Sequence, residues 1–425
     1  MFDWFHFAAY FSSMKILTTF FLLLISISAF AATPEPEPQW GFFGHRRINR
    51  LAVFALPAEL IPFYKQNIEY ITEHAVDPDK RRYATRHEGP RHFIDLDQYG
   101  KTPFENLPRG WNEALAHYTD VYLVDLRGDT VKIIGEGATR FENDRLLGAE
   151  NNRSINTQGI SAKAYQSFYN QHIFPQYYED IWQVEPDSLA QVLGINLPCR
   201  SIFAKDRLSE HGVLPYNLLH MQRRLTDAFY TRNVAAILRL SAEIGHYIGD
   251  AHVPLHTTKN YNGQLSDQIG IHAFWESRIP ELFADKSYDN FVGVAEYIRN
   301  PQDYYWKMVL ESNSLVDSVL LIEKRLKQSL PQDQQFCYEE RLGVTIRTQC
   351  TAFAQAYQEA LRGMIESRWR ASIQAVSSAW YSAWIDAGKP DLRKLNFRPD
   401  EKELEEIKAL EASLKKGKIQ GRDHE

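Results

Sequence analysis

The segment from Leu218 to His252 constrains the fold most, because it combines helical periodicity with chemically active side chains. Its apolar residues recur at the spacing of one or two long helices, and the pattern ends before Pro254. His246 and Asp250 lie four residues apart near its end. A helix places two such residues on one face, where both reach a common point.

Most of the remaining chain has the same periodicity. Helical patterns occupy residues 45–57, 301–331 and 354–388, and the last carries an apolar stripe that we assign to the core: Tyr357, Leu361, Met364, Ile373, Val376, Trp380 and Trp384. One segment differs, because residues 121–135 read as a β-hairpin whose Arg-Gly-Asp forms the turn. The sequence therefore predicts an all-α protein, with a single multi-helix domain over residues 40–398 and a small hairpin-containing insertion at about 121–200.

The two ends of the chain do not resemble the domain between them. Residues 1–32 have the pattern of a signal peptide, with a lysine, a short apolar run and small residues, and translation is expected to start at Met14. A retained membrane anchor is the alternative for this segment. A Pro/Glu-rich spacer follows at 33–39, and residues 399–425 form a charged tail, helical or disordered, to which we assign no function. We expect an exported protein, periplasmic or secreted.

The net charge and the cysteine content limit the kinds of substrate site and metal site that the chain can form. The net charge of −6 provides no general attraction for nucleic acids or anionic membranes, so such a substrate requires a local site. Of three cysteines, Cys337 and Cys350 are candidates for a disulfide, which leaves Cys199 over. There is no Cys-x-x-Cys pair, so a metal site would be built from histidine and carboxylate.

A second His–carboxylate pair strengthens that expectation. His256 follows Pro254, and sixteen residues later His272 and Glu276 again stand four apart on a predicted helix. Imidazole nitrogen and carboxylate oxygen are typical zinc ligands. Either pair alone is more often a surface contact or a hydrogen-bonded core histidine, whereas two pairs around a third histidine favour metal. We leave His252 out of the ligand set.

With the upstream residues Trp40, His45, Asp77 and His92, the last in "HFID", the pattern resembles a known family. The order, including "HYIGDAHVPLH", is similar to the superfamily of zinc-dependent phospholipases C and P-one/S-one-type single-strand nucleases. The resemblance implies a helical exported phosphodiesterase with up to three zinc ions. It assigns three ligand sets: Asp77, His92 and His246; His256, His272 and Glu276; and Trp40, His45 and Asp250.

The resemblance also implies a mechanism and a requirement. Metal-activated water attacks phosphorus, and Asp77 orients or deprotonates that water. The family's third metal uses a free α-amino group, so we expect cleavage after Gln39 to make Trp40 the first residue. The alternative is a third site that is altered, weak or empty. An amide nitrogen within the chain is a poor ligand because its lone pair is delocalised.

Two named substrate classes remain, and another phosphoester is the further alternative. A phospholipase C-like activity is favoured by Glu276 as the last ligand, the short gap before His272 and the lack of basic charge. The alternative is a single-strand nuclease or 3′-nucleotidase, in which Phe93 stacks a base, Asp95 accepts its hydrogen bonds and Lys80 contacts phosphate. The third hypothesis is a non-catalytic binding scaffold that is stabilised by structural zinc. The sequence indicates no obligate protein partner and leaves the oligomeric state undetermined.

Overall fold

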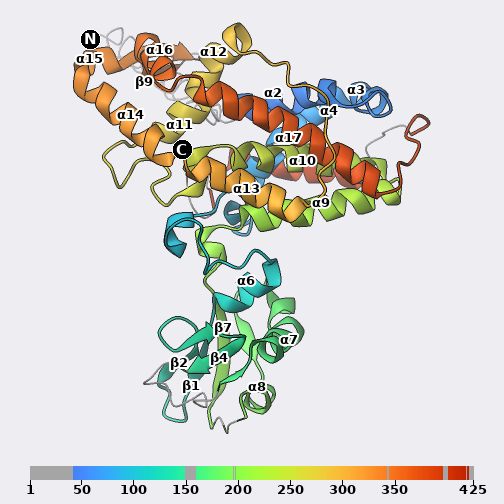
Figure 1. Ribbon diagram of the computed structural model, residues 1–425, viewed down its shortest axis with the longest axis vertical. Helices are drawn as coiled ribbons and strands as arrows, with labels where there is room; N and C mark the ends of the chain where they lie inside the picture. Colours follow the sequence, from blue (N-terminus) through green and yellow to red (C-terminus); the bar gives the residue numbers. More distant parts are fainter. Residues whose placement is uncertain are drawn as a thin grey trace, which may run out of the picture. The chain divides into compact units, whose positions relative to one another are not determined.

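The computed structural model describes residues 42–148, 159–194, 196, 198–341, 344–395, 401–417 and 419–420. The described residues are mostly helical, with small antiparallel sheets (Figure 1). The prediction of an all-α protein is correct for the helices but too simple for the whole chain. Pairing between strands far apart in sequence is the feature that the periodicity did not reveal.

Five helices form the centre of the helical body: α2 (Phe42–Ala52), α9 (Leu214–Tyr230), α10 (Val234–Ala251), α13 (Pro301–Asn313) and α17 (Met364–Asp386). Helix α10 packs against the other four (Figure 1). Asn233 caps its first turn, because the side-chain oxygen accepts a hydrogen bond from the Ala236 amide at 3.1 Å. The helix ends just before Pro254, as predicted. It therefore carries His246 and Asp250 into the middle of the body.

The predicted apolar stripe near the C-terminus does form core. Trp380 is fully buried, stacks on Tyr64 with ring centroids 4.7 Å apart, and donates a hydrogen bond to the Ser241 carbonyl at 3.0 Å. The stripe spans two helices, because the chain turns at Gly363 with φ of +78° between α16 (Thr351–Ala360) and α17. Tyr357, Ile373 and the other stripe residues are buried except Met364, which is half-buried.

Further elements, most of them short, complete the body. Before the insertion they are η1 (Val53–Ala55), α3 (Ile61–Gln66), α4 (Ile68–Glu73), η2 (His74–Val76), α5 (Asp77–Arg81), η3 (Gly89–His92) and η4 (Leu96–Tyr99). After α10 they are η7 (Pro254–Thr257), α11 (Ile271–Ala273), η8 (Phe274–Arg278), α12 (Ile279–Ser287), α14 (Val316–Ser329) and α15 (Gln332–Gln335). These segments contribute most of the candidate ligands, because they adjoin α10 on several sides.

The insertion is larger and more ordered than one hairpin. Its helical elements are α6 (Trp111–His117), α7 (Ala162–His172), η5 (Phe174–Gln176), α8 (Pro186–Leu193) and η6 (Ser209–His211). Its strands are β1 (Thr119–Val124), β2 (Thr130–Ile134), β3 (Thr139–Glu142), β4 (Arg145–Gly148), β5 (Ile160–Ser161), β6 (Trp182–Val184) and β7 (Ser201–Asp206). The predicted hairpin is β1–β2, and its turn is held by Asp125, whose carboxylate accepts three backbone N–H groups.

That hairpin belongs to a four-stranded antiparallel sheet of order β2-β1-β7-β6. Strand β7 pairs with β1 along its whole length, from Thr119 opposite Asp206 to Val124 opposite Ser201. A separate antiparallel sheet has the order β3-β4-β5. The insertion is thus closed by its own first and last strands, which explains how it interrupts the helical body.

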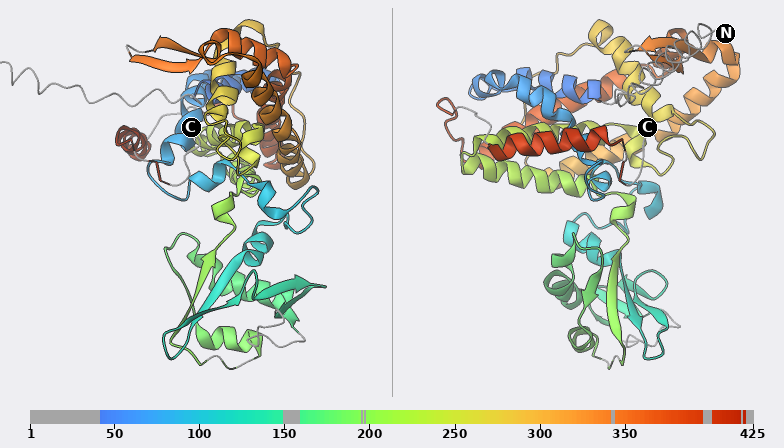
Figure 2. Two further views of the ribbon diagram at one scale, coloured as in Figure 1. Left: turned by 90° about the vertical axis from the view of Figure 1, so that its left-hand side faces the viewer. Right: turned by 180° about the vertical axis from the view of Figure 1, so that it is seen from behind.

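A second hairpin lies within the C-terminal part of the body, where the sequence predicted none. Strands β8 (Phe336–Arg341) and β9 (Val344–Gln349) pair antiparallel and appear in orange in Figure 2. Cys337 and Cys350 form the expected disulfide, and Cys199 is free. Arg278 donates to the carbonyl of Gln349 at 3.2 Å and pairs with Glu339, so the hairpin is fastened to η8.

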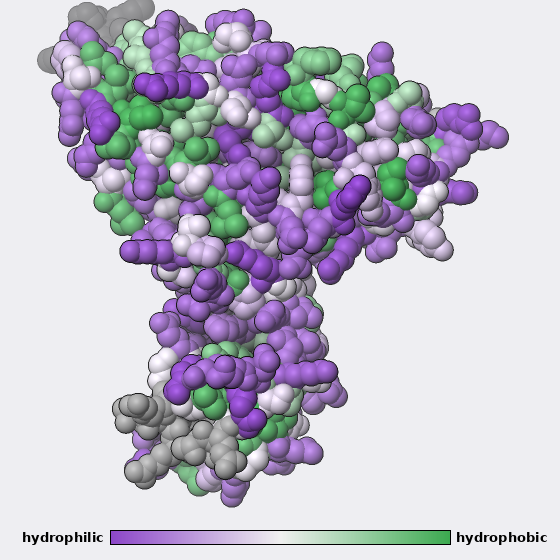
Figure 3. Space-filling model, in the orientation of Figure 1, coloured by the Kyte–Doolittle hydropathy of each residue, from purple (hydrophilic) through white to green (hydrophobic). Residues whose placement is uncertain are grey.

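The ends of the chain are described only in part. The predicted signal peptide, the spacer and Trp40 lie outside the described residues. The tail forms helix α18 (Glu401–Lys415), on the outside of the body in Figure 2. Among the described residues, no helix combines the length and apolar character needed to cross a bilayer. Hydrophilic side chains predominate on the face shown in Figure 3, with smaller hydrophobic patches between them.

Candidate metal centre

Two glycines on α10 bring helix α2 close enough to contribute to the site. A Cβ atom at Gly245 would lie 2.0 Å from the Asn49 side-chain oxygen, and one at Gly249 would lie 2.9 Å from Nδ1 of His45. Only glycine permits this approach without displacement. As a result the His45 ring stacks on His246, with centroids 3.8 Å apart. The spacing of "GHYIGD" thus places a ligand from a second helix beside the first.

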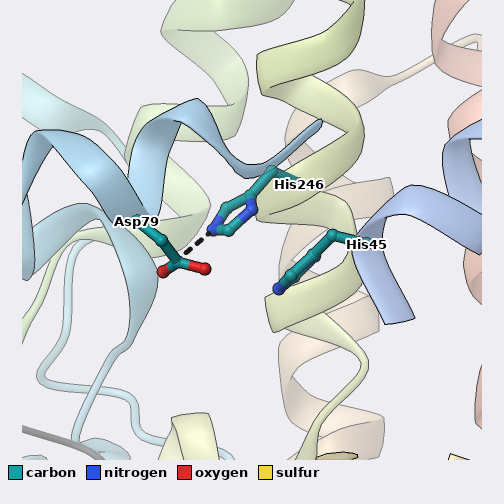
Figure 4. A group of neighbouring side chains, drawn as sticks. All are labelled: His45, Asp79 and His246. Carbon is teal, nitrogen blue, oxygen red and sulfur yellow. Dashed lines mark ion pairs between the residues drawn. The ribbon is translucent and has the colours of Figure 1, made fainter. Parts of the chain in front are cut away.

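The first group of ligand atoms surrounds His246. Its Nε2 lies 3.1 Å from Nδ1 of His92, 3.4 Å from Asp250 and 3.6 Å from Asp79. Nδ1 of His92 lies 3.0 Å from the Asp250 carboxylate. Figure 4 shows Asp79 facing His246, with His45 beside it. These atoms therefore converge from α2, α5, η3 and α10.

The second group combines the other predicted pair with His256. Oε2 of Glu276 lies 2.8 Å from Nε2 of His272 and 3.2 Å from Nε2 of His256. Glu276 is carried by η8, a π-helical turn between α11 and α12, and such turns occur frequently at functional sites. The predicted set His256, His272 and Glu276 does come together.

The two groups are continuous. Nε2 of His45 lies 3.4 Å from Asp250 and 3.6 Å from Glu276, and Nε2 of His256 lies 3.9 Å from Asp250. We call the eight residues the metal cluster: His45, Asp79, His92, His246, Asp250, His256, His272 and Glu276. They are buried apart from Glu276, whose side chain is 13% exposed.

Backbone carbonyls orient three of the imidazoles. Nδ1 of His246 donates to Ala75 at 2.8 Å, Nδ1 of His256 to His92 at 2.6 Å, and Nδ1 of His272 to Tyr261 at 3.1 Å. A histidine whose Nδ1–H is donated in this way presents the lone pair of Nε2, which is the usual arrangement of a metal ligand. All three Nε2 atoms face the cluster.

The spacing of the ligand atoms is compatible with a bound metal ion, as a comparison with tetrahedral zinc shows. Four ligands at 2.0–2.1 Å from one ion in tetrahedral geometry lie about 3.3–3.4 Å apart. The contacts around His246 and Glu276 are 2.8–3.6 Å, so little movement is needed to bring them onto ions. Nδ1 of His45 has no hydrogen-bond partner among the described residues, so no hydrogen bond to the protein fixes the tautomer of its ring.

The negative charge of the buried carboxylates also favours the binding of cations. Asp79, Asp250 and Glu276 bring three carboxylates together, and buried carboxylates are strongly destabilising unless neutralised. Burial raises the pKa of Asp79, despite the nearby His92 and His45. Burial disfavours the charged form of His92, but hydrogen bonds to Asp250 and Glu88 outweigh it and raise its pKa to about 9. The ligand atoms and the negative charge around them therefore favour the binding of metal ions.

Glu88, which the sequence analysis missed, supports His92 from the other side. Its carboxylate is fully buried, lies 3.6 Å from Nε2 of His92 and accepts hydrogen bonds from Arg81 at 3.1 Å and Arg91 at 2.9 Å. Tyr247 also donates to it. These contacts outweigh burial and hold the Glu88 pKa well below its usual range. The sequence could have revealed this pair, because Glu88 and His92 have the same four-residue spacing as His246 with Asp250 and His272 with Glu276.

The structure replaces one predicted ligand. Asp77 does not join the cluster: its carboxylate contacts His74 at 2.5 Å and Lys80 at 2.9 Å, while Asp79 occupies the expected place. Residues two apart on a helix point in nearly opposite directions, so α5 brings only one of these aspartates to His246. The structure therefore places Asp79, and not Asp77, among the residues of the cluster, and the catalytic role of Asp77 stays a prediction.

The predicted substrate residues lie in less accessible places. Phe93 and Asp95 are each only 5% exposed, so neither has a free face for a base. Lys80 is paired with Asp77. His252 was left out of the ligand set, and its Nδ1 indeed donates to the Ile248 carbonyl at 2.7 Å in the core. The predicted ligand Trp40 lies outside the described residues.

Comparisons with known proteins identify no family. No family model matches this chain, and a search of curated proteins returns no match. The fold and the cluster themselves define the class: a mostly helical protein with antiparallel insertions and buried His/Asp/Glu groups suited to metal ions.

Proposed function

We propose that the protein is an exported zinc-dependent hydrolase of phosphoester bonds. One observation carries this proposal: the two ligand groups are joined through His45 and Asp250, so ions held by them would lie next to each other. Structural zinc sites are normally closed, isolated and four-coordinate. A contiguous cluster with three carboxylates is better suited to catalysis at adjacent ions.

The residues of this chain have distinct roles in the proposal. His256, His272 and Glu276 would hold one ion, His92, His246 and Asp79 a second, and Asp250 would stand between ligands of both. When bound, zinc lowers the pKa of water from about 15.7 towards 7 and neutralises developing negative charge on phosphorus oxygens. Asp79, in the place expected for Asp77, would accept a proton from water or orient it.

Export rests on two features. The N-terminal segment has the composition of a signal peptide, and the Cys337–Cys350 disulfide is typical of proteins outside the cytoplasm. Zinc bound by histidine and carboxylate needs no reduced thiol, so the cluster is compatible with an oxidising compartment.

Phospholipid is the substrate class that we propose first, with phospholipase C-like cleavage. The short gap before His272, Glu276 as the last ligand and the negative net charge support it. The burial of Phe93 and Asp95 removes two residues that would have supported base recognition. Single-strand nuclease or 3′-nucleotidase activity remains the alternative that the same assay decides.

Metal analysis of the exported protein, with parallel assays on phosphatidylcholine, single-stranded DNA and 3′-nucleotides, tests the proposal. We expect bound zinc and release of phosphocholine. Cleavage of DNA or 3′-nucleotides alone would keep the hydrolase and change its substrate. Full activity without a transition metal would refute the zinc mechanism, and zinc binding without turnover of any phosphoester would favour the scaffold.

A further inference from the structure

A large cleft lies where the insertion meets the helical body. It has a volume of about 1190 Å³, and we call it the insertion cleft after the residues that line it, including Arg91, Trp111, Tyr177, Tyr216, Asn217 and His220. Binding sites for organic ligands are usually concave and of this order of size. None of its lining residues belongs to the metal cluster. The cleft is therefore a separate candidate site.

Cations gather on the body side of this cleft. His220 and Arg223 project from α9 next to Arg91, and all three line the cleft. Partial burial, followed by Arg224, Arg91 and Arg223, lowers the pKa of His220, so three guanidinium groups lie near one imidazole that acts as a neutral hydrogen-bonding group and not as a cation. Within the described parts of the chain, Arg223 and Arg224 have no carboxylate partner. In a chain of net charge −6 this concentration of positive charge favours an anionic ligand group.

One buried amide points to the same ligand group. Nδ2 of Asn217 is shielded from solvent, yet it has no acceptor among the described residues. A buried donor without an acceptor costs about 1–3 kcal/mol. Asn217 stands three residues before His220 on α9, so its amide and the His220 imidazole are neighbours on one helix face. An oxygen-rich anion placed there would accept from both.

Aromatic rings continue the cleft away from these cations. The row starts where Arg91 contacts the Tyr178 hydroxyl at 3.5 Å. Ring centroids are then 5.0 Å apart for Tyr178 and Tyr177, 5.5 Å for Tyr177 and Trp111, and 5.6 Å for Trp111 and Tyr216. The first two pairs meet at 78° and 82°. Such a row offers single ring faces rather than the parallel-sided slot that a nucleobase fills on both sides.

The insertion side supplies groups that bind hydroxyls. Asn112, Asn143 and Asn170 line it together with the carboxylates of Glu113 and Asp144. Amides both donate and accept, and carboxylates accept, so this wall matches ligand hydroxyl groups. Carboxylates would repel a continuous polyanion such as nucleic acid. Sugar rings fit this combination, because their C–H faces stack on single aromatic rings and their hydroxyls bond to amides and carboxylates.

We propose that the insertion cleft binds a phosphorylated oligosaccharide, with its phosphate on Arg91, Asn217, His220 and Arg223 and its sugar rings along Trp111, Tyr177 and Tyr178. The site goes beyond the proposed hydrolase function and does not depend on metal. Arg91 nevertheless touches Glu88, which contacts His92, so the phosphate would bind two contacts away from the metal cluster.

Calorimetric titration of the full protein with trehalose 6-phosphate, trehalose, inorganic phosphate and AMP tests this inference. We expect trehalose 6-phosphate to bind at least tenfold more tightly than trehalose or phosphate alone. The double variant His220→Ala/Arg223→Ala should bind trehalose 6-phosphate with at least tenfold lower affinity and bind trehalose with unchanged affinity. Tyr178→Ala, at a ring that is 63% exposed, should weaken both sugars without affecting the fold. Arg325→Ala, on the exposed face of α14, is the matched control.

Three results would overturn the inference. They are the absence of measurable binding of trehalose 6-phosphate, unchanged affinity in the His220/Arg223 variant, and AMP binding as tightly as trehalose 6-phosphate. The variant His246→Asn separates the two sites. If it abolishes sugar-phosphate binding while the cleft variants do not, the ligand binds at the metal cluster, which contradicts the cleft and leaves the proposed hydrolase standing.

Discussion

The metal cluster and the insertion cleft both concentrate charged side chains, but the charges are buried in the cluster and exposed to solvent in the cleft. His246 and Asp250 are 0% and 1% exposed, whereas Arg223 in the cleft lies in contact with solvent. Buried carboxylates require a counter-ion within bonding distance, while exposed cations are screened by water and salt. The cluster therefore predicts tightly held ions, and the cleft predicts a ligand that exchanges with solvent.

Breaking the cluster should give the largest effect. His246→Asn removes the imidazole that lies closest to His92 and leaves Asp79 and Asp250 without it. Because substitutions that merely support a ligand cost about 10- to 100-fold, loss of a ligand should lower activity by more than about 100-fold. Activity and zinc content should fall together, while circular dichroism stays near the wild type. Retained zinc and activity would show that His246 is not a ligand.

Removing the disulfide tests whether the surrounding body is as strongly constrained as the cluster. Cys337 and Cys350 are separated by 13 residues, and closure of such a loop stabilises the folded state by about 3 kcal/mol. The double variant Cys337→Ser/Cys350→Ser should lose about that much free energy of unfolding in urea. Hydrogen exchange should increase in η8, where Arg278 contacts Gln349, and stay unchanged in β1 and β7. An equal increase of hydrogen exchange in β1 and β7 would show that the insertion is not independent of the disulfide-linked part of the body.

Glu88 connects the two regions, since Arg91 belongs to the cleft and His92 to the cluster. Glu88→Gln keeps the size of the side chain and removes its charge, so Nε2 of His92 loses its carboxylate neighbour while Nδ1 keeps Asp250. Zinc affinity in a chelator competition should fall about 10- to 100-fold. Glu69→Gln, which removes an exposed pairing with Arg50, should leave the affinity unchanged. An unaltered zinc affinity in Glu88→Gln would mean that the carboxylate does not position His92.

The smallest expected effect concerns a carboxylate of the insertion. Burial raises the pKa of Asp206, although the amides of Ser209 and Leu208 donate to it. Its unfolded pKa is about 3.9, so the folded state holds the proton more tightly. Its contribution to stability is therefore greatest at low pH and falls as the pH rises through the raised folded pKa.

Urea unfolding of the wild type and Asp206→Asn across this pH range measures that contribution. The difference between the two proteins should change with pH in the stated direction, because Asn keeps an acceptor and does not titrate. A flat difference curve for Asp206→Asn would contradict the raised pKa.

Local spacing was enough to find much of the site. The four-residue separations of His246 from Asp250 and of His272 from Glu276 are set by the pitch of a helix, so the sequence already placed each pair on one face. It also identified the disulfide candidates and the buried stripe around Trp380. The two pairs and the disulfide join residues near one another in the chain, and the stripe follows from helical spacing, although the partners that bury Trp380 are distant in sequence.

The tertiary structure decided what depends on distant contacts. The choice of Asp79 over Asp77 depends on how α5 is turned towards α10, and the role of Glu88 on Arg81, Arg91 and Tyr247 arriving together. The four-stranded sheet exists because β7 returns to β1 after a long excursion of the chain. Helical periodicity records which face of a segment is buried, but which partner meets that face is settled only when all segments pack.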